Sequence, residues 1–327
     1  MVDAGVAVAF LETTGERHLQ RIGGLTALER RVRELAKAGA AKVVIAAELV
    51  DLGARKLPVP IEFVAALPAD AVPERADVIA GIELVDAAAC KRAEWQLIRR
   101  MNKSFEGPVD ALINWRFSMR ITRVLSHRSL AVTPNHITIV AILVGLCASM
   151  LVSRGTYLTV ALAGVLLEVN SILDSCDGEL ARLRFQYSKL GQWLDNLSDD
   201  IVDNLFIAAA GYGLGGIWFP LGCAAAGGRV LVSVVTYVSV YARTGTGDVF
   251  AFRWWFETDK ATADDVYDPK AVSTWLRSFG RRDTFVFLWM LACVANFPYW
   301  VVGHGLVIAG VNVSLLVLHF TVFRSRR

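Results

Sequence analysis

Three long stretches of this 327-residue chain are almost free of charge. They cover residues 129–173, 201–242 and 284–323. The only Asp, Glu, Lys or Arg residues inside them are Arg154, Glu168, Asp203 and Arg229. Because a helix of about 20 apolar residues crosses the hydrocarbon core of a bilayer, each stretch is long enough to span it. The sequence therefore predicts an α-helical membrane protein.

The overall composition agrees with this class. Apolar residues make up 54% of the chain and charged residues only 20%, whereas soluble globular chains carry roughly 25% charged residues. Soluble globular, disordered and fibrous proteins are therefore excluded. The net charge of +3 is too small to indicate a nucleic-acid partner. The five cysteines have neither paired nor ligand-like spacing, so we expect reduced thiols.

Six transmembrane helices account for the apolar stretches. We place them at 134–153, 156–175, 192–212, 217–242, 284–303 and 305–323. Seventeen Lys and Arg residues flank one side of this arrangement, and Arg154 alone lies on the other. Because Lys and Arg accumulate on the cytosolic side, we predict that both termini and the chemistry face the cytosol. The first residues lack the features of a signal peptide, so the front domain is expected to stay there.

Two segments precede the membrane domain, which covers residues 131–327. Residues 1–95 alternate between strand and helix patterns and predict a small cytosolic α/β domain. We expect strands at 5–10, 42–47, 61–66 and 78–85, with an amphipathic helix at 25–38. Residues 96–130 mix aromatic and basic residues in a juxtamembrane amphipathic segment. It lies either on the lipid surface as an interfacial helix or on its own membrane domain, and both can hold.

Four aspartates mark the predicted connection between the second and third spans. Asp174 and Asp177 stand three residues apart, and Asp195 and Asp199 stand four apart, so each pair shares one face of a helix. A short loop between the spans brings the two pairs together. Carboxylates this close to a membrane repel each other unless cations neutralise them. Oxygen ligands from two helices suit Mg²⁺ or Mn²⁺, and a pair of ions fits four carboxylates.

Small residues and one cation complete the pattern. Gly178 and Ala181 leave room for a ligand, Arg182 offers a fork for phosphate, and Gly191 opens the start of the third span. The stretch reads D-x2-D-G-x2-A-R-x8-G-x3-D-x3-D, and eight positions are specified within 26 residues. It resembles the signature of the CDP-alcohol phosphotransferase family at every position. TPNHIT at 133–138 is similar to the start of that family's first span, and the resemblance covers roughly residues 130–327.

The resemblance implies the function and the roles of these residues. It implies transfer of a phosphoalcohol group from a CDP-linked donor, either CDP-diacylglycerol or a soluble CDP-alcohol, to a hydroxyl of an alcohol or phosphorylated polyol, with release of CMP. It assigns metal binding to the first three aspartates and the general base, with a further ligand role, to Asp199. It also implies a homodimer. Nucleotide contacts fall to Gly178, Ala181, Arg182 and Gly191, joined by Asn135 and Thr138.

Three other interpretations fit the aspartates less well. Isolated helix caps or a solvated acidic patch do not produce the full spacing. An aspartate-rich membrane prenyltransferase would use the same metal chemistry, but its motifs lack the DG-x2-AR-x8-G connection. A divalent-cation transport protein would place carboxylates in the middle of its spans, whereas these lie at helix ends.

Other charged residues received more limited predictions. We expect Arg229, inside the fourth span, to pair with Asp203. Three cations on the cytosolic side are candidates for binding a phosphate-bearing acceptor, although an ordinary orienting role explains each of them as well. They are Lys189, Arg243 and Arg282.

The front domain has a resemblance of its own. The sequence IGGLTALERRVRELAKAGAAKVVIAA is similar to part of a sugar-phosphate nucleotidyltransferase. The loop that should hold a triphosphate reads LETTGERHLQR and has a single glycine, so we predict a reduced and inactive domain. The combination resembles fusions of an inositol-phosphate cytidylyltransferase with a di-inositol-phosphate phosphate synthase. By analogy, it favours inositol-phosphate-type or phospholipid synthesis with a polar phosphorylated acceptor.

Overall fold

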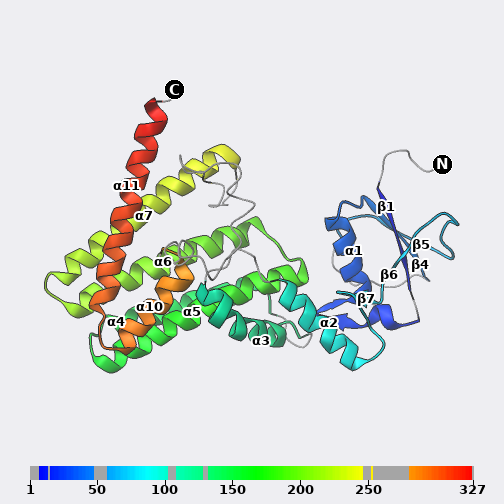
Figure 1. Cartoon of the computed structure of the whole chain (residues 1–327), viewed down its shortest axis with the longest axis horizontal. Helices are drawn as coiled ribbons and strands as arrows, with labels where there is room; N and C mark the ends of the chain where they lie inside the picture. Colours follow the sequence, from blue (N-terminus) through cyan, green and yellow to red (C-terminus); the bar gives the residue numbers. More distant parts are fainter. Residues whose placement is uncertain are drawn as a thin grey trace. The chain divides into compact units, whose positions relative to one another are not determined.

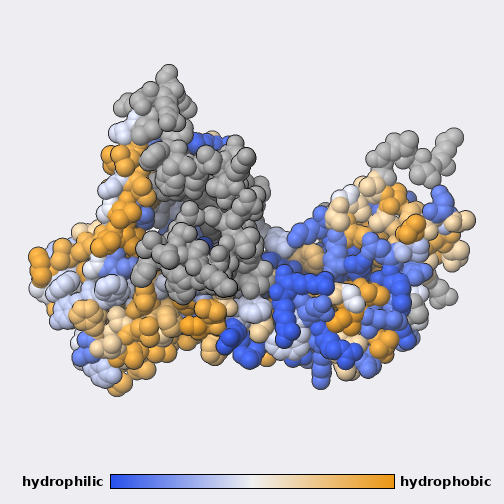
Figure 2. Space-filling model, viewed as in Figure 1, coloured by the Kyte–Doolittle hydropathy of each residue, from blue (hydrophilic) through white to orange (hydrophobic). Residues whose placement is uncertain are grey.

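The computed structural model describes residues 7–13, 15–47, 57–101, 108–127, 132–245, 252 and 280–325, without the side chains of Lys189 and of 322–325. The chain forms two compact units (Figure 1). The first comprises Met1–Met101, Arg123–Ala131 and Arg182–Gln186. The second comprises Asn102–Thr122, Val132–Ala181 and Tyr187–Arg327. Figure 2 shows mostly hydrophobic side chains over the long helices and many more hydrophilic ones over the α/β part.

A parallel sheet organises the first unit. Its strands follow the order β5-β4-β1-β6, and all three pairings are parallel. The strands are β1 (Val8–Glu12), β4 (Lys42–Ala46), β5 (Ile61–Val64) and β6 (Glu74–Arg75). Helix α1 (Ala27–Lys37) packs Leu28 and Val32 against the sheet residues Leu11, Val43 and Ile45. The unit is therefore a small α/β domain, as the alternating patterns predict.

Shorter elements complete this unit. They are a 3-10 turn (Arg17–Leu19), a hairpin of β2 (Arg21–Ile22) with β3 (Leu25–Thr26), a hairpin of β7 (Val78–Ile79) with β8 (Ile82–Glu83), and α2 (Ala87–Arg100). The second hairpin corrects the single strand expected at 78–85. Ala80 and Gly81 have φ of 53° and 82°, and two positive φ values make a tight hairpin turn.

The last turn of α5 also belongs to the first unit. Arg30 of α1 is buried, and its Nη2 donates hydrogen bonds to the carbonyls of Ile22 at 3.0 Å and Leu183 at 2.8 Å. Burial lowers the pKa of Arg30 to about 10, so the guanidinium is still charged at neutral pH. A cation at a helix C-terminus stabilises the helix, because it interacts with the carbonyl groups there that have no partner within the helix.

Long helices form the second unit. A π-helical turn (Asp110–Asn114) leads into α3 (Trp115–Leu125), followed by α4 (Pro134–Val152), α5 (Tyr157–Arg184), α6 (Lys189–Leu214), α7 (Trp218–Thr244), α10 (Arg282–Val294) and α11 (Tyr299–Ser325). Among the described residues, four helices are long and apolar enough to cross a membrane: α4, α5, α7 and Tyr299–Thr321 of α11. Helix α6 carries several aspartates, and α10 has only 13 residues.

The structure corrects two predicted helix boundaries. Helix α5 continues to Arg184 instead of ending at 175, so the first half of the aspartate motif is helical throughout. The last two spans were expected to separate near 304, but the chain turns at 295–298. Asn296 adopts a left-handed conformation with φ of 57°, and Pro298 lacks the N–H that a continuing helix needs.

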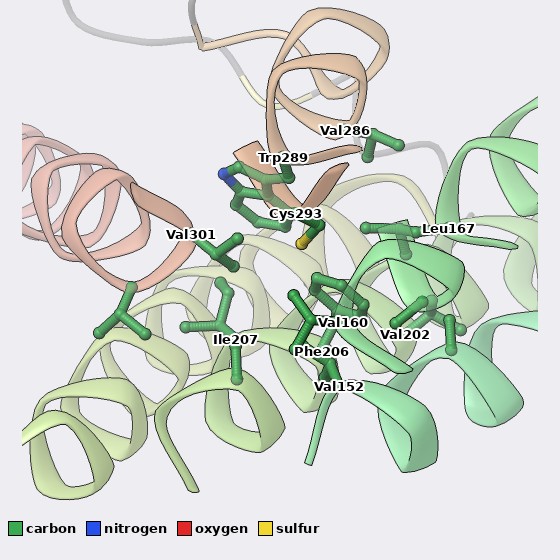
Figure 3. Close-up of a cluster of buried hydrophobic side chains, with 14 of the residues drawn as sticks. Val152, Val160, Leu167, Val202, Phe206, Ile207, Val286, Trp289, Cys293 and Val301 are labelled. Carbon is green, nitrogen blue, oxygen red and sulfur yellow. The ribbon is translucent and has the colours of Figure 1, made fainter. Parts of the chain in front are cut away.

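Side chains from α4, α5, α6, α7, α10 and α11 together build the core of this unit (Figure 3). Trp289 of α10 is fully buried and stacks on Phe206 of α6, with ring centroids 6.3 Å apart. Gly164 of α5 faces α10, where an added Cβ would lie 2.7 Å from Cβ of Cys293 and 3.1 Å from Cα of Met290. Small residues let helices approach closely in membranes, so Gly164 sets the spacing between these helices.

Replacement of this glycine tests the packing. We predict that Gly164→Ala lowers the midpoint of thermal unfolding of the detergent-solubilised protein by several degrees, because overpacking a core costs about 1–3 kcal/mol. Gly227→Ala on α7 is the matched control, since a Cβ there meets nothing within 4 Å. Tryptophan fluorescence measures both. Equal midpoints for the two variants would contradict the predicted contact.

Candidate functional site

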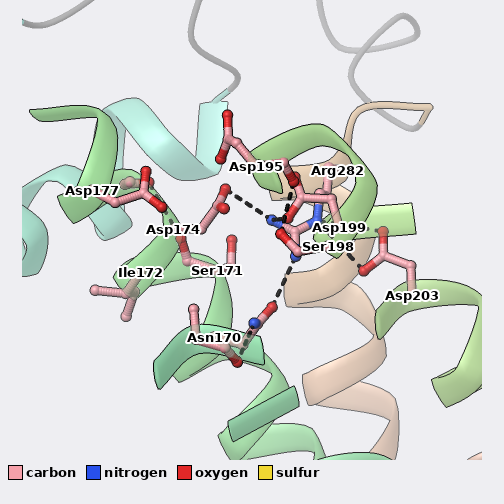
Figure 4. Close-up of polar contacts among 12 residues, drawn as sticks. Asn170, Ser171, Ile172, Asp174, Asp177, Asp195, Ser198, Asp199, Asp203 and Arg282 are labelled. Carbon is pink, nitrogen blue, oxygen red and sulfur yellow. Dashed lines mark hydrogen bonds and ion pairs between the residues drawn. The ribbon is translucent and has the colours of Figure 1, made fainter. Parts of the chain in front are cut away.

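Three carboxylates converge where α5 meets α6 (Figure 4). Asp174 and Asp177 lie on α5 and Asp195 lies on α6, and one oxygen of each lies within 4.8 Å of the others. The three-residue spacing places the first two on one face of their helix. Phe185, with φ of 53°, follows the last residue of α5. Ser188 caps α6 by accepting a hydrogen bond from the amide of Gly191 at 2.8 Å.

The start of α4 contributes to the same place. Thr138 donates a hydrogen bond from Oγ1 to Oδ2 of Asp177, which is only 5% exposed. A Cβ on Gly191 would lie 2.8 Å from Oγ of Ser188 and 3.3 Å from Oδ1 of Asn135. Asn135, Thr138 and Gly191, predicted from distant parts of the sequence, therefore gather beside the carboxylates.

The remaining motif residues lie along α5. Gly178 follows Asp177 directly, and Ala181 comes one turn later. Arg182 lies in the last turn of the helix, and its Nε is buried without a hydrogen-bond partner among the described residues. A buried guanidinium nitrogen in this condition has a hydrogen bond left to donate, to water or to an anion.

The fourth aspartate is held differently from the other three. Nη1 of Arg282, at the start of α10, lies 3.0 Å from Oδ1 of Asp199 and 3.0 Å from Oδ2 of Asp174 (Figure 4). Nη2 of the same side chain donates to Oδ1 of Asn170 at 2.8 Å. The sequence spacing predicted that Asp199 would face the site, and Arg282 was predicted only as a candidate acceptor cation. Its contact with Asp174, across 108 residues, was not predicted.

A second cation lies deeper in the helical unit. Arg229 of α7 is 3.5 Å from Asp203, which confirms the predicted pair, and its Nε donates to Oδ1 of Asn204 at 3.0 Å. Asp203 also lies 3.4 Å from Nε of Arg282. The side chains of Arg229 and Asp203 are only 11% and 2% exposed. Loss of Asp203 would leave the charge of Arg229 without a carboxylate partner among the described residues.

Glu179 is a motif neighbour that the sequence analysis missed. Its buried carboxylate accepts hydrogen bonds from Oγ of Ser118 and, at 2.6 Å, from Oγ1 of Thr122, both on α3. The sequence offered one signal for this contact: Ser118 and Thr122 are small hydroxyl residues four apart, on one helix face, in a segment that is otherwise basic and aromatic. This face of α3 therefore packs on α5. Elsewhere on the helix, Phe117 and Val124 are 54% and 64% exposed.

The candidate acceptor cations have different environments. Arg282 contacts the aspartates as described. Arg243 lies in the last turn of α7 and is exposed. Lys189 begins α6, but its side chain lies outside the described part.

The arrangement has the chemistry of a divalent-cation site. Asp174, Asp177, Asp195 and Asp199 place four carboxylates near a single guanidinium, and like charges this close disfavour joint ionisation. Hard oxygen ligands in such a group match the preference of Mg²⁺ or Mn²⁺. The donor set therefore fits a metal ion at Asp174, Asp177 and Asp195, with Asp199 beside it.

Comparison with known proteins places this geometry in a family. A family model described as CDP-alcohol phosphatidyltransferase matches residues 131–315. A relative from Thermococcus kodakarensis, a bifunctional IPC transferase and DIPP synthase, is 35% identical over 168 residues, which are 50% of this chain and 37% of that protein. A relative of the same description from Archaeoglobus fulgidus is 27% identical over 232 residues, 70% of this chain and 41% of that protein.

A further relative is described by a single activity instead of two. The archaetidylinositol phosphate synthase of Pyrococcus horikoshii is 38% identical over 99 residues, 30% of this chain and 48% of that protein. The chain thus spans less than half the length of each of these relatives.

Metal binding can be tested apart from any reaction. We predict that Asp195→Asn weakens Mn²⁺ binding by at least about 10-fold, because one of three converging carboxylates is lost. Electron paramagnetic resonance of free Mn²⁺ measures the dissociation constant. Asp200→Asn is the matched control on the same helix, since Asp200 accepts a hydrogen bond from Tyr237 at 3.0 Å instead of joining the group. Equal weakening in both variants would contradict the assignment.

Proposed function

Because the chain belongs to the CDP-alcohol phosphatidyltransferase family, we propose that it is a membrane enzyme that moves a phosphoalcohol group from a CDP-linked donor to an acceptor hydroxyl and releases CMP. The observation that carries this proposal is the convergence of Asp174, Asp177 and Asp195 beside Asp199. The family match covers the segment that contains all four aspartates.

In this proposal, the aspartates and the residues around them bind the donor. Asp174, Asp177 and Asp195 would hold Mg²⁺ or Mn²⁺, whose chemistry there is neutralisation of the donor pyrophosphate and of the leaving CMP. Arg182 would pair with phosphate oxygens through its free Nε. Gly178, Ala181 and Gly191 leave space for the nucleotide, and Asn135 and Thr138 line the same place.

Asp199 would act as the general base. The acceptor oxygen forms a bond to the phosphorus of the phosphoalcohol group while the bond from that phosphorus to the phosphate of CMP breaks. The hydroxyl proton passes to the carboxylate of Asp199. The side chain of Asp199 is 27% exposed, whereas that of Asp203 is 2% exposed. Among the aspartates of α6, Asp199 is therefore open to an acceptor and Asp203 is not.

The acceptor and donor are proposed at the level of chemical class. We infer an alcohol or phosphorylated polyol of the inositol-phosphate type as acceptor, with CDP-diacylglycerol or a soluble CDP-alcohol as donor. The names of the relatives, which include an archaetidylinositol phosphate synthase, support this class. Lys189 and Arg243 are the cations proposed to bind an acceptor phosphate.

We propose that the α/β domain does not perform nucleotidyl transfer. Arg17, one of the two arginines in the loop after β1, is already engaged, because its Nη1 lies 2.7 Å from Oε1 of Glu83. Arg75 shares that carboxylate and also pairs with Asp77 at 2.9 Å. The ion pair with Glu83 thus occupies one of the loop's cations, and the loop has a single glycine, whereas a triphosphate requires a glycine-rich loop with free cations.

We propose more membrane spans than the four helices that are long and apolar enough on their own. We propose α6 and α10 as two further spans, with both termini and the carboxylate group on the cytosolic side of the cytoplasmic membrane. Arg116 and Arg120 are the basic residues of α3, and exposed Phe117 accompanies them. This combination supports an interfacial position for the part of α3 that does not pack on α5. A homodimer is proposed from the family alone.

Release of CMP tests the proposed function. Purified full-length protein is incubated with CDP-diacylglycerol or soluble CDP-alcohols, Mg²⁺, and a panel of alcohols and phosphorylated polyols. We expect Mg²⁺-dependent CMP with at least one pair. Asp199→Asn should lower the rate by about 10²–10⁴-fold, the contribution of a general base, while Mn²⁺ still binds.

Mass spectrometry of the products identifies the donor and the acceptor in this assay. Two results would overturn the proposal: no metal-dependent CMP with any donor, or full activity in Asp195→Asn. Asp200→Asn serves again as the control and should retain its activity.

A further inference from the structure

Arg282 makes an unusual set of contacts for a residue at the start of a membrane helix. Its guanidinium reaches Asp174 and Asp199 through one nitrogen, at 3.0 Å each, and Asn170 through another, at 2.8 Å. The third nitrogen, Nε, faces Asp203 at 3.4 Å. All of the guanidinium nitrogens are therefore engaged by side chains from α5 and α6.

The helix that carries this side chain is firmly held. Asp283, the next residue, accepts hydrogen bonds from the amides of Val109 and Asp110 at 3.1 and 3.2 Å. One turn further on, Phe285 is buried, and its ring centroid lies 4.7 Å from that of Trp289 in the core. Arg282 is thus presented by a packed helix, and the positive end of the α10 dipole adds to its charge.

Arg229 and Arg282 pair with different numbers of carboxylates. Asp203 has Arg229 as a second partner at 3.5 Å, with Asn204 holding that arginine in place. Among the described residues, Asp174 and Asp199 have Arg282 as their cation. Replacement of Arg282 would therefore leave Asp203 paired but remove the cation that joins the fourth aspartate to the carboxylate group.

We propose that Arg282 is a positioning residue, a built-in cation that fixes Asp199 beside the metal-binding carboxylates and does not itself bind the acceptor. The role of Asp199 in this inference rests on the proposed function, whereas the contacts of Arg282 do not depend on it. A lysine could not reproduce them, because an ammonium is a compact charge without the planar fork that reaches several acceptors in fixed directions.

Two measurements on Arg282→Gln should move in opposite directions. We expect kcat to fall by about 10- to 100-fold, as for loss of a residue that orients a catalytic group, with the KM for the acceptor changed less than about threefold. Mn²⁺ should bind more tightly, by roughly 10-fold, because a positive charge beside Asp174 is removed. General damage to the fold would instead weaken both metal binding and turnover.

Arg281→Gln is the matched control. This neighbour has a side chain that is 46% exposed, and its Nε lies 3.7 Å from Oδ1 of Asp283. It should keep the kcat and the Mn²⁺ affinity of the unaltered protein. If Arg282→Gln does not fold, Arg282→Lys carries the test: kcat should still fall by about 10-fold while the Mn²⁺ affinity stays unchanged.

Two outcomes would overturn the inference. One is a large rise in acceptor KM at preserved kcat, which would make Arg282 an acceptor ligand. The other is unchanged or weaker Mn²⁺ binding in Arg282→Gln. Failure of the proposed function gives a different result, since the unaltered protein would then release no CMP while the Mn²⁺ titrations still report on Arg282.

Discussion

Mutual repulsion among acidic side chains is the constraint on which the rest of the site depends. Asp174, Asp177 and Asp195 approach within 4.8 Å where two helices meet, and carboxylates this close repel one another. The fold offsets part of this charge with Arg282 and buries one carboxylate against the hydroxyl of Thr138. A divalent cation would neutralise the negative charge that remains. The same helices that bury Trp289 and Phe206 therefore hold the carboxylates in place.

Local spacing predicted much of this arrangement. Residues three and four apart share a helix face, so Asp174 with Asp177 could be paired from the sequence, and a charge isolated in an apolar span pointed to its partner, Arg229 to Asp203. Contacts between distant segments could not be found this way. Arg282 reaches Asp174 across 108 residues, and Glu179 binds α3 through hydroxyls that the sequence presents as ordinary polar residues.

Helix boundaries show the same limit of sequence reasoning. The Gly-His-Gly sequence within α11 has the composition of a turn, but packing keeps it helical, and the chain turns where Asn296 and Pro298 occur together. The aspartates themselves lie on α5 and α6, whose ends meet at a short connection. Because α5 continues to Arg184, Asp174 lies well inside that helix, which corrects the helix-end position expected from the sequence. The family match, and not this position, separates the chain from transport proteins and from prenyltransferases with similar metal chemistry.

The position of a bound ion tests the central claim most directly. Anomalous scattering from Mn²⁺ in crystals of the full-length protein would locate the ion without reference to any substrate. The account predicts a peak coordinated by Asp174, Asp177 and Asp195, with Arg282 still beside Asp199. A peak elsewhere in the chain, or none at saturating Mn²⁺, would contradict it.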